Sequence, residues 1–347
     1  MSGYQLAENV SLQGRNTFRV SARAAMMADV KRADALAELF DFAMLRNGPV
    51  MVLGEGSNLL FAADYPGVAI CLTMSEIKIL DSNADGALVR CDAGVAWNDL
   101  VGWTLARGLA GLENMALIPG SVGAAPIQNI GAYGAEVGEY IETVEAFQRD
   151  TGQIKRLPKD ACAFAYRDSL FKREMDKWVV TAIELRLPRE HALRLDYAGV
   201  REELAAMGID QPRAVHVAEA ISRLRTRKLP NPAILGNAGS FFKNPVVAAG
   251  VADALKSEHA ELPVYPTGDE AQRKLSAAWM IEAAGWKGFR EGDAGISAQH
   301  ALVLVNHGKA SGAQLLALAR RVRNSVREKF AVELEPEPRI IGAPFAE

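Results

Sequence analysis

One stretch of the chain, from Asn114 to Ala135, carries no charged side chain, although Glu113 and Glu136 flank it directly. A run of this length could be a membrane-spanning helix. The interior argues against that, because prolines and glycines would break the helix and leave backbone groups unsatisfied in lipid. The interrupting residues are Pro119, Gly120, Gly123, Pro126, Gln128, Asn129, Gly131 and Gly134. The sequence therefore predicts a buried or ligand-covered segment that is neither regular helix nor regular strand.

The backbone N–H groups of such a segment have to find partners outside a helix or sheet. Glycines let the main chain approach a ligand closely, and successive N–H groups can form an anion-binding nest. Two interpretations of the run follow. It is either a loop against a large cofactor that carries phosphates or a long structural loop.

Composition narrows the class of protein. At 347 residues and 49% hydrophobic content, the chain can bury a substantial core and form two or three domains. A net charge of −3 and a pI near 6.1 give no electrostatic footprint for nucleic acid. Glu8, Arg15 and Arg19 interrupt the first twenty residues, so no secretory signal is expected. The expected protein is cytoplasmic, with no membrane contact and no feature that demands an oligomer, so we expect a monomer.

Cys71, Cys91 and Cys162 show neither a CxxC motif nor metal-ligand spacing. They are interpreted as reduced, mostly buried thiols. The five histidines are scattered, so no metal site is expected.

Hydrophobic periodicity predicts an α+β protein with mixed strand pairing rather than regular βαβ repeats. Strands are expected at Pro49–Leu53, Ala87–Asp92, Glu142–Gln148, Gln153–Leu157 and Val179–Leu187. Helices are expected from an Asn98 N-cap to Arg107 and at Ala214–Arg227, Ser276–Ala284 and Ser311–Phe330, the last with a Ser311–Gln314 capping box. The character of the chain changes between Pro188 and Ala214, which predicts a domain boundary there.

The octapeptide from Gly54 to Phe61, GEGSNLLF, follows a predicted strand. It fails as a dinucleotide-binding fingerprint because Leu59 stands where the third glycine of GxGxxG belongs, and the chain has no P-loop. It is either a loop whose N–H groups and Ser57 hydroxyl hold a diphosphate or a plain tight turn.

A second glycine-flanked turn, GNAGSFFKNP, contains Ser240. No GxSxG motif is present, which disfavours a hydrolase triad. Ser240 could donate a proton to a strongly basic carbanion, or it could simply cap the turn.

Paired charges occur in two apolar settings, AYRDS around Arg167 and LEPEPR around Glu337. An arginine fork can clamp a carboxylate, and a semi-buried acid can steady a developing charge. Both could also be structural ion pairs. The cluster Arg223, Arg225, Arg227 and Lys228 is either a solvated helix face or a phosphate-holding group.

The order of these motifs is more specific than any one of them. GEGSNLLF, IPGSVGAAPIQNIGAYGAE, AYRDS, KLPNPAILGNAGSFFKNPVV, KLSAAWMIEAAGWKG and LEPEPRIIG follow one another along the chain. The series resembles the UDP-N-acetylenolpyruvoylglucosamine reductase family, in its longer (type I) branch, from Asn16 to Gly342. The resemblance implies the FAD-binding fold shared with vanillyl-alcohol oxidase and p-cresol methylhydroxylase, followed by a C-terminal α+β substrate-binding domain.

On this resemblance, residues 1–190 would form the FAD-binding domain, as two α+β subdomains that divide near 67–75. Residues 191–213 would be a linker and substrate-covering loop, 214–330 the substrate-binding domain, and 331–347 a segment returning to the active site. The implied cofactor-binding residues are Gly54, Glu55, Gly56, Ser57, Asn58, Gly120, Ser121, Val122 and Gly123. The implied substrate-binding residues are Tyr166, Tyr197, Lys228 and Asn244.

The resemblance also implies a reaction. NADPH would reduce FAD, and hydride from flavin N5 would pass to C3 of the enolpyruvyl group of the UDP-sugar. Arg167 and Glu337, with Glu335 the weaker candidate, would stabilise the resulting enolate, and Ser240 would protonate C2 to give UDP-N-acetylmuramate. Gln299-His300 departs from the pattern of some members, so the contact at that position stays unassigned. A flavoprotein oxidase of the same fold, acting on another substrate, is the alternative.

Overall fold

The computed structural model describes residues 3–197 and 199–346; Ala198, in the predicted substrate-covering loop, lies outside the described residues. The chain divides into two compact units. The first comprises residues 1–10, 24–55 and 66–227, and the second comprises 11–23, 56–65 and 228–347. No helix among the described residues is long and apolar enough to cross a membrane.

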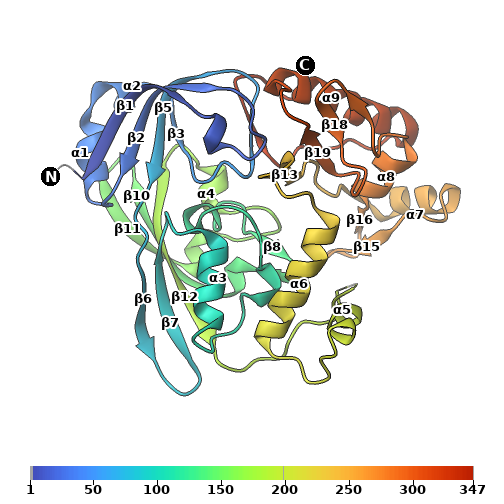
Figure 1. The fold of residues 1–347 in the computed structure, drawn as a ribbon, viewed down its shortest axis with the longest axis horizontal. Coiled ribbons are helices and arrows are strands. Elements are labelled where there is room, and N and C mark those ends of the chain that lie inside the picture. Colours follow the sequence, from blue (N-terminus) through green and yellow to red (C-terminus); the bar gives the residue numbers. More distant parts are fainter. Residues whose placement is uncertain (1–2, 198, 347) are drawn as a thin grey trace. The chain divides into compact units, whose positions relative to one another are not determined.

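The first unit contains a four-stranded sheet with the strand order β1-β2-β5-β3 (Figure 1). Its strands are β1 (Tyr4–Ser11), β2 (Arg23–Val30), β3 (Val50–Val52) and β5 (Tyr65–Leu72), and β3 pairs with β5 in parallel. Two short helices follow β2, α1 (Ala35–Asp41) and α2 (Ala43–Asn47). Leu36, Leu39 and Leu45 of these helices pack with Val68 and Ile70 of β5 in one buried cluster. This cluster holds the helices against the sheet.

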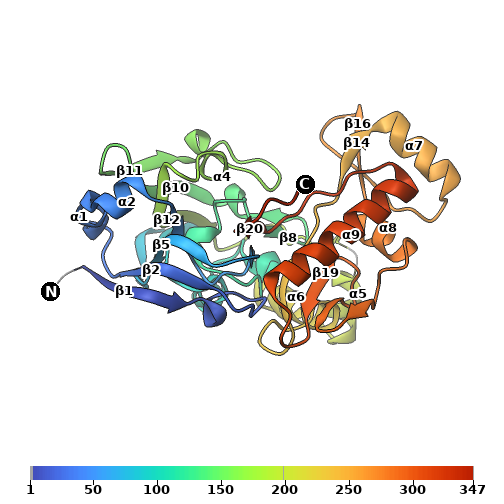
Figure 2. The ribbon, with the colours of Figure 1, turned by 90° about the horizontal axis from the view of Figure 1, so that it is seen from above.

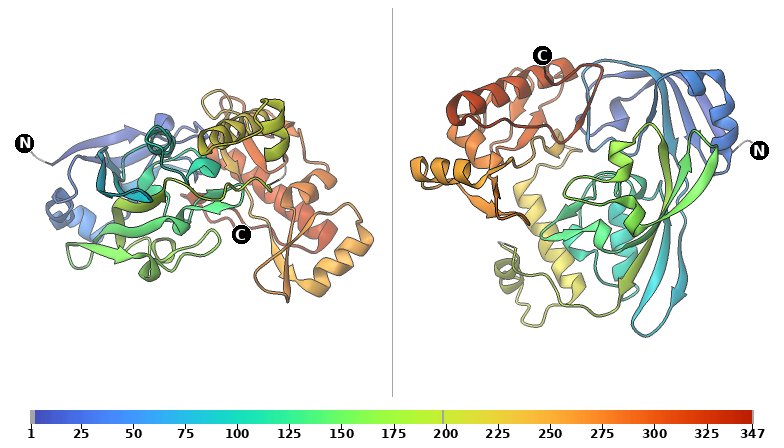
Figure 3. Two further views of the ribbon diagram at one scale, coloured as in Figure 1. Left: turned by 90° about the horizontal axis from the view of Figure 1, so that it is seen from below. Right: turned by 180° about the vertical axis from the view of Figure 1, so that it is seen from behind.

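A five-stranded antiparallel sheet in the first unit has the order β11-β10-β12-β7-β6. Its strands are β6 (Ile77–Ser82), β7 (Gly86–Asp92), β10 (Ile141–Gln148), β11 (Gln153–Pro158) and β12 (Trp178–Pro188). The hairpin of β6 and β7 projects beyond its neighbours (Figures 1 and 3). The central strand β12 is buried on both faces from Val179 to Leu185, which explains its nearly continuous apolar sequence.

Three further helices belong to the first unit: α3 (Trp97–Leu105), α5 (Val200–Ala206) and α6 (Ala214–Lys228). The buried face of α6 consists of Val217, Ala218, Ala220, Ile221 and Leu224. These residues share one core cluster with Trp97 and Leu100 of α3 and with Val144 and Ile183 of the five-stranded sheet. A short helix α4 (Leu170–Arg173) begins at Ser169, whose hydroxyl accepts the Lys172 N–H.

The charge-free run is irregular, as predicted. It contains only 3₁₀ turns at η2 (Glu113–Met115) and η3 (Val122–Ala124) and the two-residue strands β8 (Gly131–Ala132) and β9 (Ala135–Glu136). Asn129 adopts a left-handed backbone with φ 45°. Its side chain accepts the Gly138 N–H at 2.8 Å and donates to Glu136 at 2.7 Å and to the Ala165 carbonyl at 3.1 Å. A buried amide side chain thus replaces regular pairing as the support of this loop.

The second unit contains the sheet β13-β19-β18-β17, the sheet β14-β16-β15 and the parallel pair β20-β4. The strands are β4 (Leu59–Phe61), β13 (Gly236–Ser240), β14 (Val246–Ala248), β15 (Val264–Pro266), β16 (Gln272–Leu275), β17 (Arg290–Glu291), β18 (Ala294–Ile296), β19 (Val303–Asn306) and β20 (Arg339–Ile341). The helices are α7 (Ala249–Glu258), α8 (Ala277–Ala283) and α9 (Gly312–Phe330), with the turn η1 (Gln13–Arg15).

Helix α9 lies beside α8 and β19 and also contacts β4 and β18 (Figure 2). Its buried stripe includes Leu315, Leu318, Val322, Val326 and Phe330. Ser311 and Gln314 form a reciprocal capping box at its start, and Ser276 caps α8. The predictions for these two helices are confirmed.

Two details differ from the sequence predictions. Asn98 does not cap α3: the helix begins at Trp97 after Ala96, and the Asn98 side chain instead accepts the Leu117 N–H at 2.8 Å. The unit boundary lies at 227/228 rather than between Pro188 and Ala214. Helix α6 stays with the first unit because its apolar face is buried in that unit's core. Two early segments join the second unit through long-range contacts that local sequence patterns do not report. Residues 56–65 join through the pairing of β4 with β20, and residues 11–23 join through hydrogen bonds such as that of the Asn237 N–H to the Thr17 carbonyl at 3.0 Å.

Candidate active site

In the first unit, the glycine-rich turn after β3 meets the charge-free run. A Cβ at Gly54 would lie 2.5 Å from Ser121 Oγ, so a larger residue there would displace the Ser121 hydroxyl. Glu55 Oε2 accepts the Gly120 N–H at 3.0 Å. Four of the predicted cofactor-binding residues are therefore neighbours although more than sixty positions separate them in the chain.

Most N–H groups of the 120–123 turn already have protein partners. The Val122 N–H donates to the Val95 carbonyl at 2.8 Å, and the Gly123 N–H donates to the Ala93 carbonyl at 2.9 Å. A Cβ at Gly123 would lie 2.6 Å from Ala93 Cβ. The turn is thus fixed against the strand end near Ala93, and its packing accounts for these glycines without a nest of free donors.

Gly56, Ser57 and Asn58 belong to the second unit. Gly56 has φ +65°, and a Cβ there would lie 2.2 Å from the Arg15 carbonyl oxygen. Asn58 is joined to β20: its carbonyl accepts the Arg339 N–H at 3.0 Å, and its side-chain amide donates to the Glu337 carbonyl at 3.4 Å. One predicted cofactor-binding residue therefore supports a predicted catalytic one.

Arg167 lies in the first unit with a positive φ of 53°, a conformation that is unfavourable for a bulky side chain. Its Nη2 donates to the Gly131 carbonyl at 2.9 Å, and its guanidinium carbon lies 5.3 Å from the centre of the Tyr166 ring. Tyr166 itself is 47% exposed. Backbone strain of this kind occurs at functional sites, where surrounding contacts hold it in place.

Of the basic cluster on α6, one member differs from the others. Arg223 pairs with Glu219 at 2.8 Å, and Arg227 pairs with Glu203. Arg225 has no ion-pair or hydrogen-bond partner among the described residues, and its Nε is buried. Burial lowers the pKa of the Arg225 guanidinium.

Two tyrosines are associated with this part of the first unit. Tyr133, in the charge-free run, is the side chain that interacts electrostatically with Arg225, and burial raises the pKa of the Tyr133 hydroxyl. The Tyr197 ring meets the Tyr133 ring edge to face, with centroids 5.0 Å apart. Tyr197 is 52% exposed, so it covers Tyr133 while remaining accessible to solvent.

Ser240 ends β13 in the second unit. The turn before it is fixed by the buried Asn237, which accepts the Gly239 N–H at 3.0 Å and donates to the carbonyls of Pro230 and Leu235. A Cβ at Gly239 would meet nothing within 4 Å, so the backbone beside Ser240 faces open space. No hydrogen bond of Ser240 Oγ is found among the described residues, and the side chain is partly exposed.

Glu337 is brought to Ser240 by short antiparallel pairing. Phe242 bridges Pro336, and the Glu337 N–H donates to the carbonyl of Phe241 at 2.8 Å. Glu335 points to another role, because it pairs with Lys243 at 2.9 Å and is largely exposed. Of the two glutamates, Glu337 is thus bound through its N–H to the residue after Ser240, whereas the carboxylate of Glu335 is engaged by Lys243.

Lys228 and Asn244 also lie in the second unit. Asn244 Oδ1 accepts the Ala277 N–H at 3.0 Å and so holds the first residue of α8. Lys228 is exposed and lies near His300. Burial, and then the charges of Lys228 and Lys287, lower the pKa of the His300 imidazole. His300 Nδ1 accepts the Leu302 N–H at 3.3 Å, which assigns the proton of the neutral ring to Nε2.

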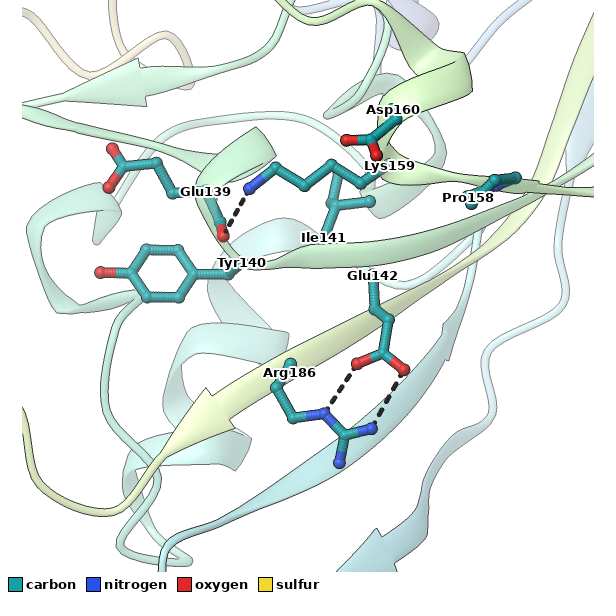
Figure 4. Close-up of a pocket in the computed structure, with 8 residues that line it drawn as sticks. All are labelled: Glu139, Tyr140, Ile141, Glu142, Pro158, Lys159, Asp160 and Arg186. Atoms are coloured by element: carbon teal, nitrogen blue, oxygen red, sulfur yellow. Dashed lines mark hydrogen bonds and ion pairs between the residues drawn. The ribbon is translucent and has the colours of Figure 1, made fainter.

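A cavity of about 270 Å³ lies away from these residues, beside β10 and η5 (Lys159–Cys162) (Figure 4). Among its lining residues, Lys159 donates to the Glu139 backbone carbonyl at 3.1 Å, and Arg186 binds Glu142 through two hydrogen bonds. None of the predicted site residues lines it.

Sequence reasoning missed Asn129, Asn237 and Tyr133 as supports of the site. Each stands in a motif that was singled out, and two of the three are buried amides whose local signal is a polar residue in an apolar, glycine-rich segment. The role of Asn237 could have been suspected on that ground, because a buried amide must bind several partners.

Comparison with known proteins first defines the class. A family model described as "FAD binding domain" matches residues 24–158. A second, described as "UDP-N-acetylenolpyruvoylglucosamine reductase, C-terminal domain", matches residues 231–341. The fold is that of an α+β flavoprotein, an FAD-dependent oxidoreductase with a separate C-terminal domain.

Relatives and solved structures give the particular family. The UDP-N-acetylenolpyruvoylglucosamine reductase of Xanthomonas axonopodis pv. citri (strain 306) is 54% identical over 342 residues, which cover 99% of this chain and 98% of that protein. That of Xanthomonas oryzae pv. oryzae (strain PXO99A) is 54% identical over 341 residues, 98% of this chain and 97% of that protein. The crystal structure of the enzyme from Thermus caldophilus aligns with a TM-score of 0.67 at 25% identity and covers 97% of this chain and 99% of that one. The chain belongs to the UDP-N-acetylenolpyruvoylglucosamine reductase family.

Proposed function

We propose that the chain uses NADPH to reduce the enolpyruvyl ether of UDP-N-acetylglucosamine to UDP-N-acetylmuramate, in the synthesis of peptidoglycan precursors. The single observation that carries the proposal is that the segment following Ser240 pairs with the segment that contains Glu337 in the second unit. This pairing brings the backbones of the two residues onto neighbouring segments, beside the turn at Gly239, and so supports a joint role. Family membership supplies the substrate class.

The residues present fit a phosphate-bearing cofactor. A buried arginine without an anionic partner is unfavourable by itself and becomes favourable when a phosphate neutralises it. Arg225 meets this description, and it lies in the same unit as Gly54, Glu55 and the 120–123 turn. Residues of these two loops, with Ser57 and Asn58, would hold FAD. The N–H groups of Val122 and Gly123 already donate to protein carbonyls, so they do not contribute donors to the phosphates.

When bound, FAD supplies the redox chemistry, the transfer of a hydride from NADPH to C3 of the enolpyruvyl group. The chain's residues would do the rest. Arg167 would bind the carboxylate of the substrate with its planar guanidinium fork. Glu337 would stabilise the charge that develops at C2 and in the carboxylate, and Ser240 Oγ would give its proton to C2. An alcohol can do this because the carbanion is a much stronger base than an alkoxide.

The remaining predicted residues would hold the sugar nucleotide. Lys228 offers an exposed cation for a phosphate, Asn244 stands at the start of α8, and Tyr166 and Tyr197 are half-exposed rings suited to cover a ligand. We further propose that the protein acts as a monomer in the cytoplasm.

The decisive experiment is a visible spectrum of the purified protein, followed by anaerobic addition of NADPH and then of the enolpyruvyl sugar nucleotide. The expected sequence is yellow colour, bleaching by NADPH and recovery of colour on addition of substrate. Failure of the sugar nucleotide to restore colour, with rapid reoxidation by oxygen instead, would show a flavoprotein oxidase with another substrate.

A further inference from the structure

An aromatic cluster in the second unit lies directly behind Ser240. Phe241 and Phe242, the next two residues, are 1% and 2% exposed, and their ring centroids lie 5.1 Å apart. Phe345 contacts both of them, at 6.4 Å from Phe241 and 6.1 Å from Phe242. Phe18 meets Phe241 at 6.3 Å. Ser240 is thus the last residue of β13, and the two phenylalanines that follow it contact the Phe345 ring.

Two arginines of α9 hold Phe345 in place. Arg320 Nη2 donates to the Pro344 carbonyl at 2.7 Å, and its Nε donates to the Phe345 carbonyl at 3.2 Å. The guanidinium carbon of Arg323 lies 4.9 Å from the centre of the Phe345 ring, and Arg323 is itself buried, at 8% exposure. The Arg323 cation near the Phe345 ring and the charged Arg320 donors on the carbonyls of Pro344 and Phe345 hold residues 344–345 more firmly than most surface loops are held.

The same contacts reach Glu337. The segment 241–243 pairs with 335–337 through the Phe242–Pro336 bridge and the bonds on either side of it. This pairing is only a few residues long, and short antiparallel pairs have little stability of their own. The packing of Phe345 on Phe241 and Phe242 therefore supports the register in which the segment after Ser240 pairs with the segment that ends at Glu337.

We propose that Phe345 is a positioning residue, which acts through Phe241 and Phe242 to keep Ser240 and Glu337 in the geometry for proton delivery. This inference rests on the proposed function. It has a specific kinetic consequence. A displacement of about 1 Å at a reacting group can cost on the order of 10²-fold in rate. Loss of Phe345 should slow the step that needs Ser240 and leave the reduction by NADPH unchanged.

The test uses the full-length holoenzyme in three forms, wild type, Phe345→Ala and Phe345→Leu, with Phe289→Ala as the matched control. Phe289 is also a partly buried ring of the second unit; it packs on Trp286 at 4.9 Å and lies 5.4 Å from the guanidinium carbon of an α9 arginine, Arg321. Stopped-flow absorbance measures reduction by NADPH and reoxidation by the sugar nucleotide separately. The solvent deuterium isotope effect on reoxidation, and amide hydrogen exchange at Phe241 and Glu337, are measured alongside.

For Phe345→Ala we expect reoxidation to slow by about tenfold or more, with a larger solvent isotope effect and faster exchange at both amides. Reduction by NADPH should stay within about twofold of wild type, Phe345→Leu should recover part of the loss, and Phe289→Ala should match wild type in both steps. Equal slowing of both steps, or no change in reoxidation, would overturn the positioning role. If wild type itself is not reoxidised by the sugar nucleotide, the proposed function fails, and amide exchange alone still decides whether Phe345 orders the two segments. If Phe345→Ala does not fold, the same comparisons are made with Phe345→Leu.

Discussion

Arg225 gives the sharpest prediction, because a partly exposed cation whose Nε is buried without a partner among the described residues should destabilise the free protein and strengthen ligand binding. We expect Arg225→Met, which keeps the aliphatic stem and removes the charge, to raise the free energy of unfolding of the ligand-free protein. Replacement of a buried ion pair by well-packed apolar residues of similar volume is often neutral or stabilising by about 1–4 kcal/mol, and removal of one unpaired charge should act in the same direction. Because Arg225 is partly exposed, we expect the lower part of this range, about 1–2 kcal/mol.

The same substitution should weaken ligand binding. A hydrogen bond to a charged group contributes about 1.5–3 kcal/mol, which corresponds to a roughly 10- to 150-fold change in affinity. Urea unfolding of the ligand-free protein measures the first effect. Titration of the ligand-free protein with FAD, and of the holoenzyme with UDP and with NADP⁺, measures the second. The ligand whose affinity falls identifies the phosphate that Arg225 binds.

Arg223→Met is the control, because Arg223 lies on the same helix, is half-exposed and pairs with Glu219 four residues away. Surface pairs of this kind contribute about 0.3–0.5 kcal/mol, so neither stability nor affinity should change by more than that. The reasoning is refuted if Arg225→Met leaves all three affinities unchanged, or if it destabilises the ligand-free protein while Arg223→Met does not.

Three further outcomes are expected. Ser240→Ala should retain reduction by NADPH and lose turnover by at least about 10²-fold, without a change in stability beyond about 0.5 kcal/mol, since no hydrogen bond of its hydroxyl is found among the described residues; normal steady-state turnover would exclude Ser240 as the proton donor. Arg167→Lys should also lose turnover, because a point charge does not replace a planar fork, and wild-type kinetics in this variant would rule out bidentate binding. The hydrogen-bonded Arg90 lowers the pKa of the Glu145 carboxyl, so its stabilisation is present above the unfolded value of about 4.3 and is lost as pH falls through the lower folded value. Arg90→Gln should therefore cost about 3–5 kcal/mol near pH 7 and progressively less below pH 4, in urea unfolding across pH; a cost independent of pH would contradict the assignment.

Elements of the fold that depend on local chemistry could be predicted from the sequence. Helix α9 begins after the Ser311–Gln314 capping box, ends at Phe330 and buries the apolar residues that the periodicity predicts. The hairpin of β10 and β11 follows from alternation around a turn with Gly152 at φ +67°. Asn98 shows the limit of this approach, because its amide has a partner across a loop, and tertiary contact overrides its preference for a cap.

Non-local pairing could not be predicted. The parallel pair β4–β20 joins positions near 60 and 340, and no local pattern reports it. For the same reason the roles of Ser240 and Glu337 were predicted only from family resemblance, and no local pattern reports the bond between the Glu337 N–H and the carbonyl of Phe241. Likewise, Arg223, Arg225 and Arg227 recur at every second position of α6 and look alike in sequence. Only their surroundings, a carboxylate beside Arg223 and Arg227 but, for Arg225, a buried Nε without a partner in the described part of the chain, distinguish a solvated face from a site for an anion.

The lack of charge between Asn114 and Ala135 now has a physical explanation that does not require a ligand. The run is held by neutral amides, and charged groups from outside it act on its backbone: Glu55 accepts the Gly120 N–H, and Arg167 donates to the Gly131 carbonyl. A charged side chain at a buried position of the run, such as Val122 or Ala125, would cost several kcal/mol unless it were paired. The two interpretations of the run are therefore complementary. Its glycines and amides are explained by its own packing, and any interaction with phosphate has to come from the few donors that this packing leaves and from the unpaired cation of Arg225.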